Sequence, residues 1–230
     1  MKIETYEQGT VEWALSRLAL PTASCYSKIL TEKTLKPSTS RGLYCAELLA
    51  EYILGEPVDW GSNAWTERGT DMEEEARMWY EFDQDVEVQQ VGFITRDDGE
   101  TGGSPDGLIV GRKKGLEIKC FGAANHMLRL LDYHDKEPEI PFAQVQGYLY
   151  LTDYDEWDVL YYNPRLPRHI VTVYPDEKWR AAFVPVLDEF IVRLNREKEK
   201  WEHVRNLHPM SNEIQAELAA QEARRHTTTL

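Results

Sequence analysis

Two carboxylates and a lysine are spaced so that a β-hairpin would bring them together. Asp106 follows Ser104-Pro105, and Glu117 and Lys119 come after ten intervening residues. Side chains at positions i and i+2 of a strand point to the same face, so Glu117 and Lys119 would project together while Ile118 points into the core. Pairing across the turn would bring Asp106 beside Glu117. The spacing therefore predicts a polar site shared by two neighbouring strands.

The chemistry that this set of residues supports is metal-assisted phosphate chemistry. Mg²⁺ prefers a few protein oxygens and keeps several waters, and Asp106, Glu117 and a backbone carbonyl would supply such ligands. The ion would polarise a phosphate and lower the pKa of a bound water. Lys119, a point charge on a flexible stem, could orient that water or stabilise the transition state.

The same spacing also fits an exposed hairpin with a surface Glu–Lys pair, and spacing alone leaves that alternative open. Two features favour a functional site. Gly107, directly after Asp106, permits close backbone approach beside a ligand. Leu116, Ile118 and Cys120 are apolar and indicate a buried strand, so the polar residues between them require a reason.

The elements that must position these residues follow from the hydrophobic periodicity. Helices are expected at 10–20, from Thr22 or Ser24 to Leu30, at 41–54, from Asn63 to about Phe82, and at 123–131, 141–151 and 176–204. Strands are expected at 86–90, 93–95, 104–110, 116–120, 157–162 and 169–174. Helices before and after a central mixed sheet indicate an α/β core.

Length and composition fit one globular domain. The chain has 230 residues, of which 42% are hydrophobic and 29% charged. We expect a single domain at 1–206, with an N-terminal helical lobe of about residues 1–60, and a weakly helical tail at 207–230. There is no apolar run of membrane-spanning length, and the first residues lack the apolar block of a signal peptide, so we expect a cytoplasmic location.

The cysteines and histidines argue against a zinc or iron–sulfur site. Cys25, Cys45 and Cys120 are far apart, there is no CxxC pair, and the six histidines show no HExxH spacing. The cysteines are expected to be buried free thiols in a reducing compartment. Any metal must therefore be held by oxygen atoms.

The net charge of −14 neither proves nor excludes a nucleic-acid partner, because its distribution is uneven. Residues 1–45 carry six basic and four acidic residues, whereas residues 46–100 carry three basic and sixteen acidic ones. An acidic body with a mildly basic N-terminal lobe could bind DNA along one face only.

The segments around the two carboxylates resemble a known nuclease core. The pattern S-P-D-G-L…G-L-E-I-K-C is similar to that of the PD-(D/E)xK nucleases, in particular the lambda-exonuclease or YqaJ-like viral recombinase family. The resemblance implies an α/β fold with a restriction-endonuclease-like core, a central mixed β-sheet flanked by helices. It also implies Asp106, Glu117 and the carbonyl of Ile118 as metal ligands, and Lys119 as the catalytic lysine.

Three further motifs resemble the family in the same order. In Gly69-Thr70-Asp71-Met72-Glu73, the glutamate would complete the metal site, and in Ala143-Gln144-Val145-Gln146 the first glutamine would lie near it. In Trp13-Ala14-Leu15-Ser16-Arg17 followed by Thr22-Ala23-Ser24, Arg17 and Ser24 would grip a 5′-terminal phosphate. Taken singly, each motif fits an ordinary helix surface or N-cap. Their joint occurrence across residues 13–146 favours the family.

The resemblance implies a Mg²⁺-dependent 5′-to-3′ exonuclease, with Mn²⁺ as an alternative ion. It would act on double-stranded DNA ends through the N-terminal lobe and leave a 3′ single-stranded overhang for a single-strand annealing protein. It further implies a homotrimeric ring, and a location in the host cell cytoplasm if the protein is encoded by a phage or prophage. The chain departs from the family after Lys119-Cys120, where Phe121-Gly122 replaces a proline and an aromatic residue. The residues that separate the strands are not assigned.

Two alternatives remain open. A restriction- or repair-type endonuclease on the same core would cleave covalently closed circular DNA. A non-catalytic DNA-binding scaffold that recruits an annealing protein would tolerate Asp106→Ala. Relatives with an iron–sulfur cluster are disfavoured, because four clustered cysteines are missing.

Overall fold

A five-stranded mixed sheet lies at the centre of the computed structural model, which describes residues 1–58, 67–135, 140–205, 207, 211, 214–216 and 219–220. Its strands are, in spatial order, β10 (His169–Val173), β9 (Glu156–Tyr162), β8 (Lys114–Cys120), β7 (Gly107–Ile109) and β4 (Val88–Gln89). β8 and β9 are parallel, and the other neighbours are antiparallel. The predicted mixed sheet is therefore confirmed.

Two smaller sheets belong to the N-terminal part of the chain and its neighbours. One pairs β1 (Lys2–Glu4) with β5 (Phe93–Thr95) and β5 with β6 (Gly102–Gly103). The other is the short hairpin of β2 (Leu30–Thr31) and β3 (Lys36–Pro37). Because β1 pairs only with a distant strand, the start of the chain is fixed by tertiary structure.

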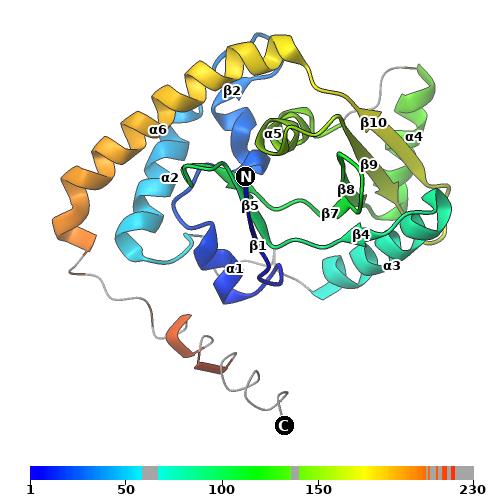
Figure 1. Cartoon of the computed structure of the whole chain (residues 1–230), viewed down its shortest axis with the longest axis horizontal. Coiled ribbons are helices and arrows are strands. Elements are labelled where there is room, and N and C mark those ends of the chain that lie inside the picture. The colour runs from blue at the N-terminus through cyan, green and yellow to red at the C-terminus, as the bar shows by residue number, and fades with distance from the viewer. Residues whose placement is uncertain are drawn as a thin grey trace.

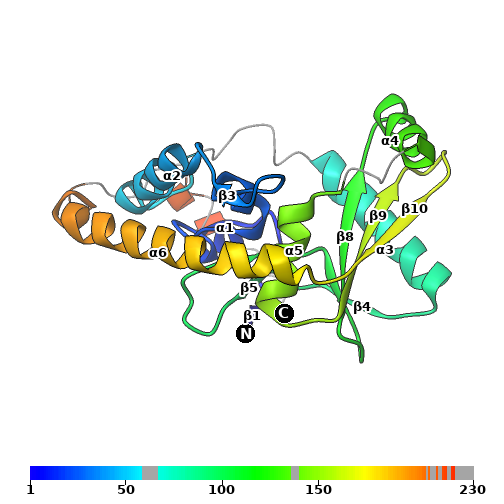
Figure 2. The same cartoon turned by 90° about the horizontal axis from the view of Figure 1, so that it is seen from above.

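Helices cover both faces of the central sheet (Figures 1 and 2). α3 (Glu67–Gln84) packs on one face over a core that includes Ile118 and Leu160. α5 (Phe142–Thr152) packs on the other face, where Tyr148 stacks on Trp157 at 4.9 Å between ring centroids. α4 (Ala123–Asp135) follows β8 directly. Among the described residues, no helix is both long and apolar enough to cross a membrane.

The N-terminal lobe consists of α1 (Val11–Ser16), the 3₁₀ helix η1 (Ala23–Lys28) and α2 (Arg41–Leu54). The long helix α6 (Glu177–Arg205) runs beside this lobe (Figure 1). Its Phe183 lies 4.6 Å from the ring of Tyr26 in η1, and its Phe190 stacks on Tyr44 of α2 at 5.6 Å. Phe183 also meets Tyr150 of α5 edge to face. α6 therefore contacts the lobe and the helix that covers the sheet.

Several predicted element boundaries differ from the structure. α2 has the predicted bounds and ends at Gly55, whose φ of 73° is easily adopted by glycine. The helix predicted at 10–20 ends at Ser16, and Ala19 then adopts a φ of 56°. The helix predicted to reach Leu30 is wrong in type and length, because β2 begins there. The strand predicted at 104–110 begins at Gly107, since Pro105 has no N–H for a ladder.

Parts of the prediction fall on residues outside the described ranges. They include the proposed cap Asn63 and most of the tail at 207–230, in which only residues 214–216 and 219–220 are described as helical. The division into one domain at 1–206 and a tail remains a prediction.

Candidate active site

The start of β7 lies against the first half of β8, and the chain just before β7 places Asp106 beside Ile118. Gly107, the first residue of β7, pairs with Leu116. Asp106 immediately precedes this pair. Its Oδ2 accepts a hydrogen bond from the backbone N–H of Ile118 at 2.5 Å. The N–H and C=O of one strand residue point to the same edge, so the carbonyl of Ile118 faces the side of Asp106.

Glu117 is the most buried carboxylate of this group, with 3% of its surface exposed. Its Oε1 accepts hydrogen bonds from Lys119 Nζ at 2.6 Å and from Gln144 Nε2 at 2.8 Å. Its Oε2 is buried and has no hydrogen-bond partner among the residues that the structure describes. A buried carboxylate oxygen without a partner is costly, so this atom indicates a position for a cation or another ligand.

Glu73 of α3 adds a third carboxylate within electrostatic range. The pKa of Asp106 is raised well above its usual value by burial, and further by Glu117 and Glu73. Burial also raises the pKa values of Glu73 and Glu117. Burial alone would lower the pKa of Lys119, but Glu117, Asp106 and Glu73 raise it above its ordinary value. The excess of negative charge in this buried group favours the binding of a cation.

The donor set fits Mg²⁺ rather than a metal held by many side chains. In the part of the chain that the structure describes, no three His, Cys, Asp or Glu side chains form a group that could hold a metal ion. Asp106, Glu117 and the Ile118 carbonyl are oxygen donors, and Mg²⁺ commonly takes one or two carboxylates and fills its other positions with water. The partnerless Glu117 Oε2 fits this mode of binding.

A chain of hydrogen bonds connects Glu117 to α1. Gln144 also donates to the hydroxyl of Tyr148 at 2.9 Å, and Tyr148 donates to the Ser104 carbonyl at 2.9 Å. Trp13 Nε1 donates to Ser104 Oγ at 2.8 Å. Tyr148 was not predicted, although it lies four residues after Gln144 and so on the same helix face. That spacing in the sequence could have indicated that Tyr148 lies near the site.

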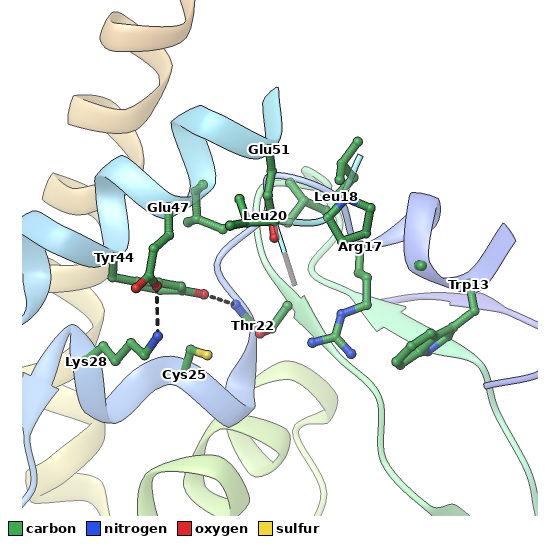
Figure 3. Close-up of a pocket in the computed structure, with 14 residues that line it drawn as sticks. Trp13, Arg17, Leu18, Leu20, Thr22, Cys25, Lys28, Tyr44, Glu47 and Glu51 are labelled. Carbon is green, nitrogen blue, oxygen red and sulfur yellow. Dashed lines mark hydrogen bonds and ion pairs between the residues drawn. The ribbon is translucent and has the colours of Figure 1, made fainter. Parts of the chain in front are cut away.

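Arg17 lines a cavity of about 480 Å³ between α1, η1 and α2 (Figure 3). Its guanidinium lies 4.6 Å from the centroid of the Trp13 ring. On the α2 side Glu47 pairs with Lys28 at 2.8 Å. The pKa of Tyr148 is raised by burial, and the charge of Arg17 acts in the opposite direction. Arg17 is therefore within electrostatic range of the hydrogen-bond chain that ends at Glu117.

The surroundings of Ser24 differ from the expectation. Ser24 is exposed, and its Oγ lies 3.3 Å from the Oγ1 of Thr22. Thr22, not Ser24, is the residue that precedes the helix, and η1 is a 3₁₀ helix of six residues. The helix dipole therefore contributes less to phosphate binding at Ser24 than was expected, because so short a helix has only a small dipole.

A second cleft, of about 390 Å³, adjoins Asp106 and Glu73. It is lined on one side by the N-terminal segment, whose Gln8 donates to the carbonyls of Val91 and Pro105 at 3.0 and 2.9 Å. Its acidic lining residues are Glu7, Glu73, Glu74 and Asp106, with Arg77 as a basic one. We call it the acidic cleft.

Comparison with known proteins gives the fold a context. Residues 12–155 match the YqaJ-like viral recombinase domain. An alkaline exonuclease (LHK-Exo) from Laribacter hongkongensis is 28% identical with a TM-score of 0.71, over 84% of this chain and 97% of that one. LHK-Exo in complex with dAMP gives 27% identity and 0.71, over 86% and 100%. No match was found among curated proteins.

A more distant structure agrees in fold alone. The phage related exonuclease from Haemophilus somnus 129PT is 16% identical, with a TM-score of 0.53, over 77% of this chain and 96% of that one. These likenesses confirm the predicted fold class, a PD-(D/E)xK-like α/β core with a mixed sheet flanked by helices.

Proposed function

The chain belongs to the YqaJ-like viral recombinase family, and from this premise we propose that it is a Mg²⁺-dependent 5′-to-3′ exonuclease acting on double-stranded DNA ends. The observation that carries the proposal is the partnerless Oε2 of Glu117 beside Asp106 and Lys119. The likeness to an alkaline exonuclease that was also solved with dAMP supports a deoxynucleotide product. The strand left behind would be a 3′ single-stranded overhang for an annealing protein in the host cell cytoplasm.

Asp106, Glu117 and the Ile118 carbonyl are the residues that would hold the metal, with Glu73 nearby. When bound, Mg²⁺ (or Mn²⁺ in its place) would supply Lewis-acid polarisation of the scissile phosphate and a water of lowered pKa. The short contact of Gln144 with Glu117 Oε1 fixes the carboxylate, which leaves Oε2 for the ion. Gln144 therefore acts on the reaction by orienting Glu117.

Lys119 is the cation of the site. Its ammonium is held 2.6 Å from Glu117 Oε1. Its raised pKa keeps it protonated at neutral pH. A fixed positive charge at this place would stabilise the extra negative charge that a phosphate acquires as its bond is broken. We assign Lys119 this role.

Arg17 is proposed to bind the 5′-terminal phosphate, with Ser24 as a second donor. Stacking on Trp13 uses the face of the guanidinium and leaves its N–H edge for a phosphate. We expect Arg17→Gln to lower kcat/KM on 5′-phosphorylated ends by about 10- to 100-fold, the value of one or two charge-assisted hydrogen bonds.

The measurement for Arg17→Gln is the initial rate on duplexes with a 5′ phosphate and on duplexes with a 5′ hydroxyl. The variant should lose rate only on the phosphorylated ends. Arg193→Gln, an exposed arginine on α6, serves as the matched control. An equal loss on both kinds of end would rule out a phosphate contact.

A ring of three subunits would reconcile the net charge with DNA binding. The chain carries −14 overall, most of it between residues 46 and 100, whereas residues 1–45 carry an excess of two basic residues. In a ring, basic lobes would line the channel and the acidic outer surface would repel DNA from wrong sites. A monomeric mass by light scattering would contradict this arrangement.

Digestion of linear against covalently closed circular duplex, with and without a 5′ phosphate, tests the proposed function in Mg²⁺. We expect linear DNA to be degraded, fastest with the phosphate, and circular DNA to stay intact. Cleavage of the circle would indicate an endonuclease. Intact linear DNA under all conditions would indicate a non-catalytic DNA-binding protein.

A further inference from the structure

A small cavity adjoins Lys119 on the side of the site away from α1. Its volume is about 160 Å³, and it is lined by Lys119, Phe121, Arg129, Ile140, Pro141 and Tyr161. Arg129 comes from α4, and α4 and α1 lie on opposite sides of β8 in both views (Figures 1 and 2). We call it the aromatic cavity. The cavity thus adjoins the helix on the far side of β8 from α1, the helix that Arg17 follows.

The lining of the aromatic cavity combines flat rings with positive charge. The Cζ of Arg129 lies 4.5 Å from the centroid of the Phe121 ring. Phe121 and Tyr161 are stacked at 6.2 Å with an interplanar angle of 17°. The two charged residues in the lining, Lys119 and Arg129, are both cations. Aromatic rings and guanidinium planes are the surfaces on which unpaired bases stack.

The acidic cleft and the aromatic cavity, which both adjoin the candidate active site, differ in the charge of their lining residues. The acidic cleft adjoining Asp106 has four carboxylates and one arginine, Arg77, in its lining, whereas the described residues that line the aromatic cavity include no carboxylate. A DNA strand carries a phosphate at every nucleotide. Apart from the phosphate that the metal would hold beside Asp106, the strand is therefore repelled by the acidic cleft and attracted by the aromatic cavity. The charge distribution therefore favours a path for the strand past Lys119.

We propose that the aromatic cavity receives the base of the nucleotide that follows the cleaved bond. This inference rests on the proposed function, in which the 5′-terminal nucleotide extends from Arg17 to the metal site. The next nucleotide of the same strand then lies on the far side of Glu117 and Lys119. Phe121 and Arg129 provide its stacking platform.

The proposal is tested with a duplex whose second nucleotide from the 5′ end lacks its base. Release of the labelled first nucleotide reports the first cleavage only. For the wild type, we expect removal of the base to lower kcat/KM about tenfold, within the range of one base–aromatic stack. The same lesion placed several nucleotides farther in should have no effect on this first cleavage.

Two variants then test whether the effect of removing the base depends on the residues that line the aromatic cavity. Phe121→Leu keeps an apolar side chain without a ring, and Arg129→Gln keeps a long polar side chain without the charge. Each should lower kcat/KM about tenfold on the intact end and show no further loss on the abasic end. Arg112→Gln, an exposed arginine in the turn at the other end of β8, should discriminate between the two substrates as the wild type does.

Binding without cleavage provides a second readout. A fluorescent adenine analogue at the second position is quenched when it stacks, so its emission should fall when the wild type binds the end in EDTA. The fall should be smaller by about half or more with Phe121→Leu, because the ring is removed.

The outcomes separate this inference from the proposed function. If the wild type treats intact and abasic ends alike, or if both variants keep the tenfold discrimination, the base does not occupy the cavity. Equal losses on both substrates would show that Phe121 and Arg129 only hold α4 against β8, and this too would overturn the inference. If the wild type fails to release any nucleotide from the intact end, the proposed function itself is wrong.

Discussion

Asp106→Asn should abolish DNA digestion, with kcat/KM reduced by about 10³-fold or more. Asparagine keeps an oxygen for the Ile118 N–H but removes the negative charge that would hold Mg²⁺. A metal contributes several kcal/mol to the transition state of phosphate hydrolysis, and about 1.4 kcal/mol corresponds to each factor of ten. The measurement is the rate of nucleotide release from a 5′-phosphorylated linear duplex at saturating Mg²⁺.

The fold should survive this substitution. The ionised form of Asp106 is disfavoured by its burial and by Glu117 and Glu73, which raise its pKa. A carboxyl group with a raised pKa opposes folding when it is ionised, so the free energy of unfolding in EDTA should not fall. Asp83→Asn, on the exposed surface of α3, is the matched control and should digest DNA at the wild-type rate. Near-normal digestion by Asp106→Asn would remove Asp106 from the site.

Lys119→Ala should abolish turnover while metal binding survives. We expect kcat to fall about 10²- to 10³-fold, as when one preorganised donor to a transition state is removed. The ammonium is not a ligand, and its loss removes a positive charge beside Glu117. Calorimetric titration with Mg²⁺ in the absence of DNA should therefore give an affinity equal to or higher than that of the wild type.

The combination of the two readouts is what identifies the role of Lys119. Loss of both metal binding and turnover would mean that Lys119 is needed to build the site. Retention of turnover would mean that another group stabilises the reaction. Lys113→Ala, in the exposed turn between β7 and β8, removes the same side chain from a neighbouring position and should change neither measurement.

Long periodic elements were predictable from the sequence. Most short ones were not, although β5 has the predicted bounds, 93–95. The bounds of α2 follow from its apolar stripe and from Gly55. β9 begins at Glu156, one residue before its predicted start, and its predicted bounds follow from an apolar segment that only Asp158 interrupts. β1, β2, β3 and β6 have two or three residues each, which is too few to show a period. Their pairing depends on partners far away in the sequence, such as Ile3 with Ile94.

The central part of the candidate site was predictable for a local reason. Strand periodicity puts Glu117 and Lys119 on one face, and the turn between β7 and β8 returns the chain to Asp106. The contact of Gln144 with Glu117 depends on how α5 packs on the sheet, and no spacing within one segment contains that information. The link from Trp13 through Ser104 to Tyr148 joins three separate segments, and for the same reason it appeared only in the structure.

The contacts of α6 have a consequence for the size of the products. Phe183 and Phe190 pack α6 against η1, α2 and α5, and Gln144 of α5 donates a hydrogen bond to Glu117. Arg17 follows α1, and α1 is joined to α5 by the hydrogen bonds that run from Trp13 through Ser104 to Tyr148, so the separation between Arg17 and Glu117 depends on both sets of contacts. In the proposed reaction, a constant separation between the site for the 5′ phosphate and the metal site would make every product the same length.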